Sequence, residues 1–286
     1  MNIIVGFPFY FIYQKLSALI AALVLLVVSC DEMNIGSPEG AEIIDQHRYV
    51  LFEYDVTSQG VTNDGEYFYF SGSTNMSKAC MKTGRIFITS TNAIPEELEE
   101  KGCNHIGGLS YYNGYIYAAI EDGPDYNNSF IALYDAETLE YTGTYYEVPH
   151  ELHLEGVPWC AVDVERGYLY TAEWTNATVL NVFDLETLEL VKLVPLSQPI
   201  DRIQGAEIFD GILYMSCDEE NDMKRIFTLN PETGVVEECF RRNIGKQFEA
   251  EGLTVFADEN GDPVICVLDR GERRASVNLT YYKIAE

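Results

Sequence analysis

The stretch RIQGAEIFDGILYMSCDEE, residues 202–220, decides the fold. A Gln-Gly pair opens an alternating apolar run, an Asp-Gly pair interrupts it, a second alternating run follows, and acidic residues end it. Alternation with a period of two on both sides of Asp-Gly indicates two short antiparallel strands joined by a tight turn. The same pattern recurs along the chain at residues 58–73, 106–122, 160–174 and 250–270.

The recurrences have a regular period. Their turn glycines are Gly65, Gly114, Gly167, Gly211 and Gly261. The intervals between them are 44 to 53 residues, which is the size of a propeller blade. A second turn with Asp or Asn at its start follows at 134–138, 183–187 and 229–234, so each complete unit contains four strands.

Four short strands cannot bury both faces of their sheet alone, so neighbouring units must stack on one another. We therefore predict an all-β fold, a five-bladed β-propeller with four antiparallel strands per blade. The last unit offers three strands, and RYVLFEYDV at 48–56 precedes the first unit, so we expect this N-terminal strand to complete the last blade. Residues 48–286 then form one propeller domain. An open β-sandwich is the alternative, and the regular period argues against it.

The composition limits the partners. The chain has 286 residues, of which 47% are hydrophobic and 13% aromatic, and its formal net charge is -28. This charge repels phosphate backbones and anionic membrane surfaces, so we expect no nucleic-acid binding and no polybasic membrane docking. Partners should be neutral or cationic: a small-molecule, glycan or protein ligand, with metal ions included. The simpler alternative is that the negative charge serves only to keep the protein soluble. We expect the protein to be a monomer.

The N-terminus has the features of an export signal. After Lys15 comes the apolar stretch LSALIAALVLLVVSC, which is short for a membrane span and suited to a signal peptide. Ser29-Cys30 after this stretch resembles a bacterial lipobox, which implies a lipoprotein signal peptide over 1–30 and lipidation of Cys30. An uncleaved anchor built from residues 3–28 is the alternative. We expect an extracytoplasmic protein, lipid-anchored in the cell envelope, with residues 31–47 as a polar tether.

Six cysteines remain if Cys30 carries lipid, and an even number in an exported chain permits disulfides. Cys80 and Cys103 lie in loop-like sequence and are the one candidate pair. Cys160 and Cys266 lie within strand patterns, where a buried thiol is expected. A short helix is expected near 95–101, where Pro95 precedes EELEEK.

The long connections should gather at one end of the propeller. If each blade's first strand begins at this end, the connections from strand two to strand three and from one blade to the next return to it. These connections include 149–158 and 241–252, whereas the turns at the other end are short. Long loops on a rigid scaffold are where sites are built, so we place the ligand at this end of the central channel, which we call the mouth.

A polar residue before a glycine opens the innermost strand in four blades, and Gly107-Gly108 replaces this pair in blade two. Glycine allows backbones to approach closely near the axis. The preceding residues could then form a polar ring at the mouth, composed of Gln59, Glu155, Gln204 and Glu251. Their oxygens suit water, a ligand or calcium, which is the cofactor we consider. Alternatively, these side chains only satisfy backbone groups between blades.

HELHLEG, residues 150–156, is a second candidate site. His150, His153 and Glu155 could coordinate a transition metal, with His105 converging from the neighbouring blade, although the spacing does not match HExxH. Surface histidines are the simpler interpretation. Trp159 and Trp174 flank this region and could stack on a sugar, or could pack in the core. These residues complete the predicted ligand-binding set of Gln59, His105, Glu155, Trp159, Trp174, Gln204 and Glu251.

SQGVTNDGEYFYFSGS at 58–73 resembles the first repeat of plant-type glutaminyl-peptide cyclotransferases, which are five-bladed propellers. AEGLTVF at 250–256 and the DLETLEL-type turns are similar to that family and to the quinoprotein-like and YVTN propellers. Gln59, Gly60, Glu251 and Gly252 match the motif positions, so the resemblance implies the fold. Two functions follow as hypotheses. One is a surface-tethered binding propeller, and the other is an extracytoplasmic metal-assisted enzyme, cyclotransferase-like or hydrolase-like. No nucleophile motif points to catalytic residues.

Overall fold

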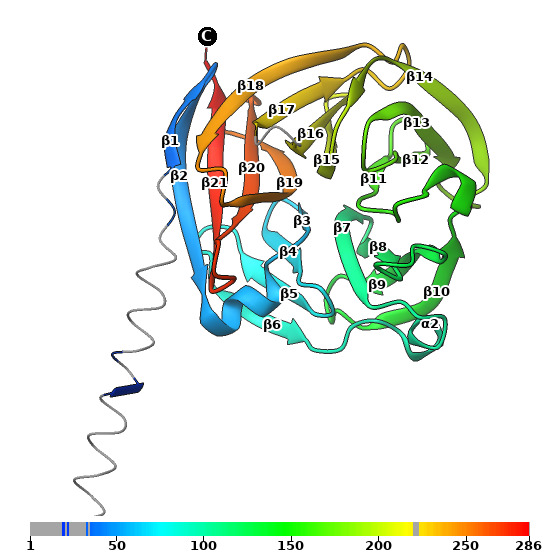
Figure 1. Cartoon of the computed structure of the whole chain (residues 1–286), viewed down its shortest axis with the longest axis horizontal. Coiled ribbons are helices and arrows are strands. Elements are labelled where there is room, and N and C mark those ends of the chain that lie inside the picture. Colours follow the sequence, from blue (N-terminus) through cyan, green and yellow to red (C-terminus); the bar gives the residue numbers. More distant parts are fainter. Residues whose placement is uncertain (1–18, 21, 23–32, 34, 220–222, 286) are drawn as a thin grey trace, which may run out of the picture.

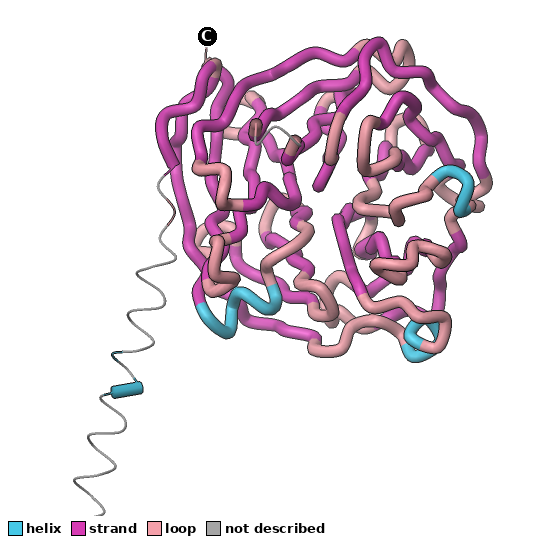
Figure 2. The backbone as a smooth tube through the Cα atoms, viewed as in Figure 1, coloured by secondary structure: helices cyan, strands magenta, loops and turns pink. Residues whose placement is uncertain are grey.

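Five twisted β-sheets surround a central axis in the computed structural model of the chain (Figure 1). The structure describes residues 19, 20, 22, 33, 35–219 and 223–285. Each sheet has a core of four antiparallel strands, so the predicted all-β five-bladed propeller is confirmed. Helical turns lie only at the periphery of the described chain (Figure 2).

The first three blades follow the chain in order, each from its innermost to its outermost strand. Blade one contains β3 (Val61–Asn63), β4 (Tyr67–Ser71), β5 (Met76–Cys80) and β6 (Ile86–Ser90). Blade two contains β7 (His105–Tyr112), β8 (Tyr115–Glu121), β9 (Ser129–Asp135) and β10 (Tyr141–Glu147). Blade three contains β11 (Ala161–Asp163), β12 (Tyr168–Thr171), β13 (Ala177–Asp184) and β14 (Leu190–Ile200).

The last two blades also recruit strands from the N-terminal part of the chain. Blade four contains β15 (Ile203–Phe209), β16 (Ile212–Asp218), β17 (Lys224–Leu229) and β18 (Val236–Ile244), and β1 (Ile35–Glu39) adds a fifth strand outside β18. Blade five contains β19 (Glu249–Ala257), β20 (Pro263–Arg270), β21 (Ser276–Ile284) and β2 (Ala41–Val50). The short helices are η1 (Leu51–Val56), α2 (Glu96–Glu99) and η2 (His150–Leu152).

The repeated turns form for the reasons that the sequence suggested. Asp210 and Gly211 have φ values of 48° and 73°, as a two-residue hairpin turn with two left-handed positions requires. In the second type of turn, Asp135 Oδ1 accepts hydrogen bonds from the N–H groups of Glu137 and Thr138 at 2.9 and 2.8 Å. These bonds lower the pKa of Asp135. The side chain thus closes each turn at a fixed length.

Hydrophobic side chains pack between blades and close the ring. Five clusters of buried residues each join two neighbouring blades, and one of them joins blade five to blade one. In that last cluster, Tyr49 of β2 packs edge-on against Phe70 of β4, with ring centroids 5.3 Å apart. Because every blade has two neighbours, both faces of each sheet are covered.

The N-terminal strand completes blade five, as predicted, but it lies at other residues. β2 spans Ala41–Val50, whereas residues 51–56 of the expected strand form the helix η1. The Glu53 side chain accepts a hydrogen bond from the Val50 N–H at 3.2 Å, which fixes the start of this helix. Residues 35–47, expected in a polar tether, therefore belong to β1 and β2 of the propeller, because the free edges of β18 and β21 pair with them.

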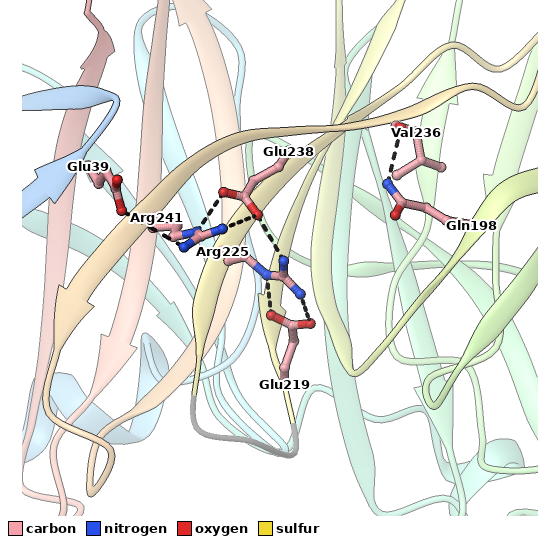
Figure 3. Close-up of polar contacts among 7 residues, drawn as sticks. All are labelled: Glu39, Gln198, Glu219, Arg225, Val236, Glu238 and Arg241. Atoms are coloured by element: carbon pink, nitrogen blue, oxygen red, sulfur yellow. Dashed lines mark hydrogen bonds and ion pairs between the residues drawn. The ribbon is translucent and has the colours of Figure 1, made fainter.

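Charged side chains accompany the added strand β1 on the outer surface of blade four (Figure 3). Arg225 pairs with Glu219 and, at 2.8 Å, with Glu238. Glu238 also accepts from Arg241 Nε at 2.7 Å, and Arg241 approaches Glu39 of β1 at 4.0 Å. This chain of alternating charges links β1 to the blade, although the exposed pairs that Arg241 forms with Glu39 and Glu238 contribute little stability each.

All six cysteines of the described residues are free thiols. The candidate pair Cys80 and Cys103 is therefore not bonded, and burial raises the pKa of Cys103 to about 12. The proposed lipidation site Cys30 and the signal peptide around it lie outside the described residues, apart from residues 19, 20 and 22. Within the described chain, no helix is long and apolar enough to cross a membrane.

Candidate functional site

The innermost strands meet at glycines around the axis. A Cβ on Gly252 would lie 2.7 Å from the carbonyl oxygen of Gln59 and 2.8 Å from Gly60 Cα. A Cβ on Gly205 would lie 2.7 Å from Gly252 Cα. The Gly252 N–H also donates to the Gln59 carbonyl at 2.8 Å. These glycines are thus required by the close approach of backbones from different blades.

A cavity of about 270 Å³ opens at the mouth, directly beside these glycines. Its walls include six of the seven residues predicted to bind a ligand. They are Gln59, His105, Glu155, Trp174, Gln204 and Glu251. Connections after β4, β8, β10 and β12 contribute to the same wall, so long loops from different blades do gather at one end of the channel.

His105 joins two other residues of the cavity wall. Its Nδ1 lies 3.1 Å from Glu121 Oε1, and its Nε2 lies 2.9 Å from the Gln59 side-chain oxygen. The Gln59 amide can present either an oxygen or an NH₂ group to the ring, so the contact suits both protonation states of His105. The triad Gln59–His105–Glu121 therefore orients three polar groups of blades one and two toward the mouth.

Two buried carboxylates on the wall each keep one oxygen without a hydrogen bond. Glu121 Oε2 and Glu251 Oε1 have no hydrogen-bond donor, and the two residues are 7% and 4% exposed. Arg270 Nε lies 3.3 Å from Glu251 Oε1 without hydrogen-bond geometry, and its guanidinium also pairs with Glu249. Burial raises the pKa of Glu251 well above its ordinary value. Such atoms are costly unless something donates to them.

Blade three departs from the expected ring. Glu155 lines the cavity, but Gly156 lies before the innermost strand with φ 82°, and a Cβ there would lie 2.1 Å from Glu121 Oε2. Gly156 therefore makes room for the Glu121 carboxylate. The place of the inner glycine is taken by Pro158, whose carbonyl accepts from the Gly108 N–H at 2.8 Å.

Two predicted site residues lie elsewhere. Trp159 does not line the mouth, because its side chain is fully buried in the core between blades three and four. His153 is also fully buried, with its ring nitrogens bonded to Gly156 O at 3.1 Å and Thr171 Oγ1 at 2.8 Å. Burial lowers the pKa of His153 to about 4. Both nitrogens are thus occupied, so His153 does not join His150 and Glu155 as a metal ligand.

The structure adds four titratable residues to the wall beyond the predicted ligand-binding set: Glu121, Tyr126, Glu249 and Arg270. Glu121, Glu249 and Arg270 lie at the charged ends of strand patterns. Charged residues are common at strand ends on any propeller surface, so this position alone did not mark them as site residues. Tyr126 lies in the loop after β8, where Glu121 and Glu155 contribute to raising the pKa of its phenol after burial itself.

A second unassigned carboxyl, Glu207 of β15, lies deeper in the channel. It is buried and accepts from Thr62 Oγ1 and Thr254 Oγ1, both at 3.0 Å. Burial raises the pKa of Glu207 to about 8. The sequence signal that could have identified Glu207 is its position inside the alternating run AEIF, because a polar residue on the inner face of a strand requires partners.

Metal ligands do not cluster in the described part of the chain. No group of three or more His, Cys, Asp or Glu side chains is arranged there to hold a metal ion. The mouth instead combines carboxylates, amides, one imidazole and one indole, a set that can bind a polar organic molecule through hydrogen bonds and stacking.

The fold and the mouth define a five-bladed β-propeller with a polar axial cavity. The chain belongs to the family described as a repeat of unknown function (DUF6923), whose model matches residues 102–262, more than half of the chain. A search of curated proteins finds no match.

Solved structures that align with this chain share little sequence with it. Hydrazine synthase of Kuenenia stuttgartiensis aligns over 76% of this chain and 57% of its own, with 13% identity and a TM-score of 0.44. The computationally designed Ika8 protein aligns over 77% and 57%, with 13% identity and a TM-score of 0.36. Sqt1 of Saccharomyces cerevisiae aligns over 85% and 60%, with 13% identity and a TM-score of 0.37. The chain thus spans less than two thirds of each of these chains.

Proposed function

We propose that this propeller binds a small polar ligand in the cavity at its mouth. The observation that carries the proposal is the convergence of Gln59, His105, Gln204 and Glu251, far apart in the sequence, on one cavity that also exposes Trp174. Residues that only joined blades would be fully hydrogen-bonded, whereas two buried carboxylates here each retain an oxygen that accepts no hydrogen bond.

The size of the cavity limits the ligand. Drug-sized ligands occupy pockets of roughly 300–1,000 Å³, so a volume of about 270 Å³ suits a small molecule or the end group of a glycan or peptide. A folded protein domain could enter only with a single projecting side chain. The proposal therefore favours a small-molecule ligand over an extended protein interface.

A variant that fills the mouth tests this function. Ser73 lines the cavity with an exposed side chain, so Ser73→Trp should block the cavity without disturbing the core. We expect at least one compound among sugars, amino acids, amines and divalent cations to raise the Tm of the native protein and not that of the variant. Equal shifts in both proteins, or no shift with any class, would remove the proposal.

We further propose that the protein is an extracytoplasmic lipoprotein anchored through Cys30. The support is sequence: the apolar stretch that ends at Ser29-Cys30. Expression of the full chain in bacteria should yield a membrane-bound, acyl-labelled protein, and Cys30→Ala should abolish the labelling. Labelling that persists in the variant would contradict the anchor.

An enzyme acting at the same mouth is the second candidate, and one contact favours it. Glu121 lies behind His105, as a carboxylate does when it orients a histidine for proton transfer. On this alternative, glutaminyl peptides or sugar and phosphate esters would be turned over, and His105→Gln would lower kcat by about 100-fold or more. Turnover that is unchanged in the variant would exclude His105 as the acid–base group.

A further inference from the structure

We infer that the ligand of the mouth is a small organic cation whose ammonium or guanidinium N–H groups bond Glu121 Oε2 and Glu251 Oε1, the carboxylate oxygens of the wall that accept no hydrogen bond. The inference rests on the proposed binding function and specifies the ligand class.

The unpaired atoms of the wall carry this inference. Among the cavity-lining residues of the described chain, the buried side-chain atoms that lack a hydrogen bond are Glu121 Oε2 and Glu251 Oε1, of which Glu251 Oε1 lies 3.3 Å from Arg270 Nε. Both are acceptors, and within the described residues no buried donor atom of the wall lacks a hydrogen bond. A ligand that offers only acceptors would leave both oxygens unsatisfied, whereas an N–H donor removes the desolvation cost of each.

The charges on the wall point to the same class of ligand. Four carboxyl groups line the cavity, at Glu121, Glu155, Glu249 and Glu251, against one guanidinium at Arg270. Arg270 already pairs with Glu249 and faces Glu251, so its charge is largely compensated. The chain carries a formal net charge of -28, which attracts cations toward the mouth and repels anions.

The positions of the two oxygens favour an elongated organic cation over a metal ion. Glu121 ends β8 of blade two and Glu251 lies in β19 of blade five, and blade one separates these blades in the ring. The described chain contains no group of three metal-ligating side chains. A short aliphatic diamine carries donors at two separated points and fits a cavity of about 270 Å³.

Binding should be linked to ionisation of Glu251. Burial is the main cause of its raised pKa, and the nearby Asp269 adds to it. The cationic groups that oppose this shift or approach the carboxyl are Arg202, Lys224, Arg270 and Arg274. A bound ammonium favours the ionised carboxylate, so we expect a proton to be released on binding and the affinity to increase as the pH rises.

Isothermal titration of the full chain with three probes tests the inference. The probes are 1,4-diaminobutane, the neutral 1,4-butanediol of the same length, and calcium chloride. We expect the diamine to bind at least about tenfold more tightly than the diol, because only the diamine carries the charged donors. Glu121→Gln and Glu251→Gln should each weaken diamine binding by about tenfold or more, and the exposed Glu140→Gln should leave it unchanged.

The outcomes separate this inference from the binding function. Equal affinity for the diol, or a response to calcium alone, would overturn the cationic class while leaving a ligand site at the mouth. Diamine binding that survives in Ser73→Trp would also overturn it. Because this variant keeps both carboxylates, it remains a test if the Gln variants do not fold. If no compound of any class binds the native protein, the binding function itself fails.

Discussion

Thr62 of blade one and Glu207 of blade four lie in separate sheets, yet Thr62 Oγ1 donates to Glu207 Oε2 across the channel at 3.0 Å. Thr254 of blade five donates to the same oxygen at the same distance. One buried carboxyl thus ties three blades together at the axis. Its ionisation would place an uncompensated charge in the interior, which makes it a determinant of how stability depends on pH.

We expect the stability of the protein to fall as the pH rises from about 4.5 to 8. The pKa of Glu207 is about 8 in the folded protein, whereas its ordinary value is 4.5. Between these two pH values the folded state holds a proton that the unfolded state has lost. The contribution is at most about 5 kcal/mol. Urea unfolding at pH 5, 6.5 and 8 should show a flatter pH dependence in Glu207→Gln, and parallel curves would contradict this expectation.

His153 should act in the opposite direction. Its pKa is about 4 in the folded protein against an ordinary 6.5, so the folded state stays neutral while the unfolded state takes up a proton. Stability should therefore be lost as the pH falls from about 6.5 to 4, by at most about 3 kcal/mol. His153→Gln should remove this dependence, and the exposed His150→Gln should not. An NMR titration of the His153 ring with a midpoint near 6.5 would refute the assignment.

Gly252→Ala should destabilise the propeller strongly. The new methyl group would lie 2.7 Å from the Gln59 carbonyl oxygen, and both backbones are held by their own sheets. We expect a loss of about 1–3 kcal/mol or more, seen as a lower Tm. Gly114→Asn is the control, since nothing lies within 4 Å of its Cβ position, and its cost should be at most about 1 kcal/mol. Similar losses in both variants would argue against crowding at the axis.

The two N-terminal strands should contribute unequally to stability. A chain that starts at Ala41 loses β1, which adds only an outer strand to blade four, and should unfold cooperatively with a small decrease in Tm. A chain that starts at Leu51 also loses β2, which exposes the edge of β21 and removes the buried Tyr49. We expect this chain to aggregate or to lose several kcal/mol. Comparable Tm values for the two chains would show that β2 does not close the ring.

Much of the fold could be predicted because it depends on local, repeated signals. A turn that ends in glycine and alternating strands recur in every unit, and the period sets the number of blades. The limits of β2 could not be predicted, because residues 41–47 form a strand only where the free edge of β21 pairs with them. The same reason applies to β1 and the edge of β18.

The part of the candidate site that could be predicted from the sequence is the set of residues next to the glycines of the innermost strands. Gln59, Gln204 and Glu251 precede inner glycines and line the cavity, as the pattern suggested. Trp159 and His153 were misplaced, because a residue type alone does not distinguish a core position from a cavity wall. Glu121 was missed, since its role depends on Gly156 from the next blade making room for its carboxylate.

The sequence by itself determined the number of blades, the closure by an N-terminal strand and the end of the channel at which long loops gather, because turn chemistry and strand periodicity act over a few residues. Only the tertiary structure decided which side chains share the mouth and which carboxyl groups are buried. Burial and unsatisfied acceptors arise where blades that are distant in sequence pack together, and no local sequence pattern specifies that packing.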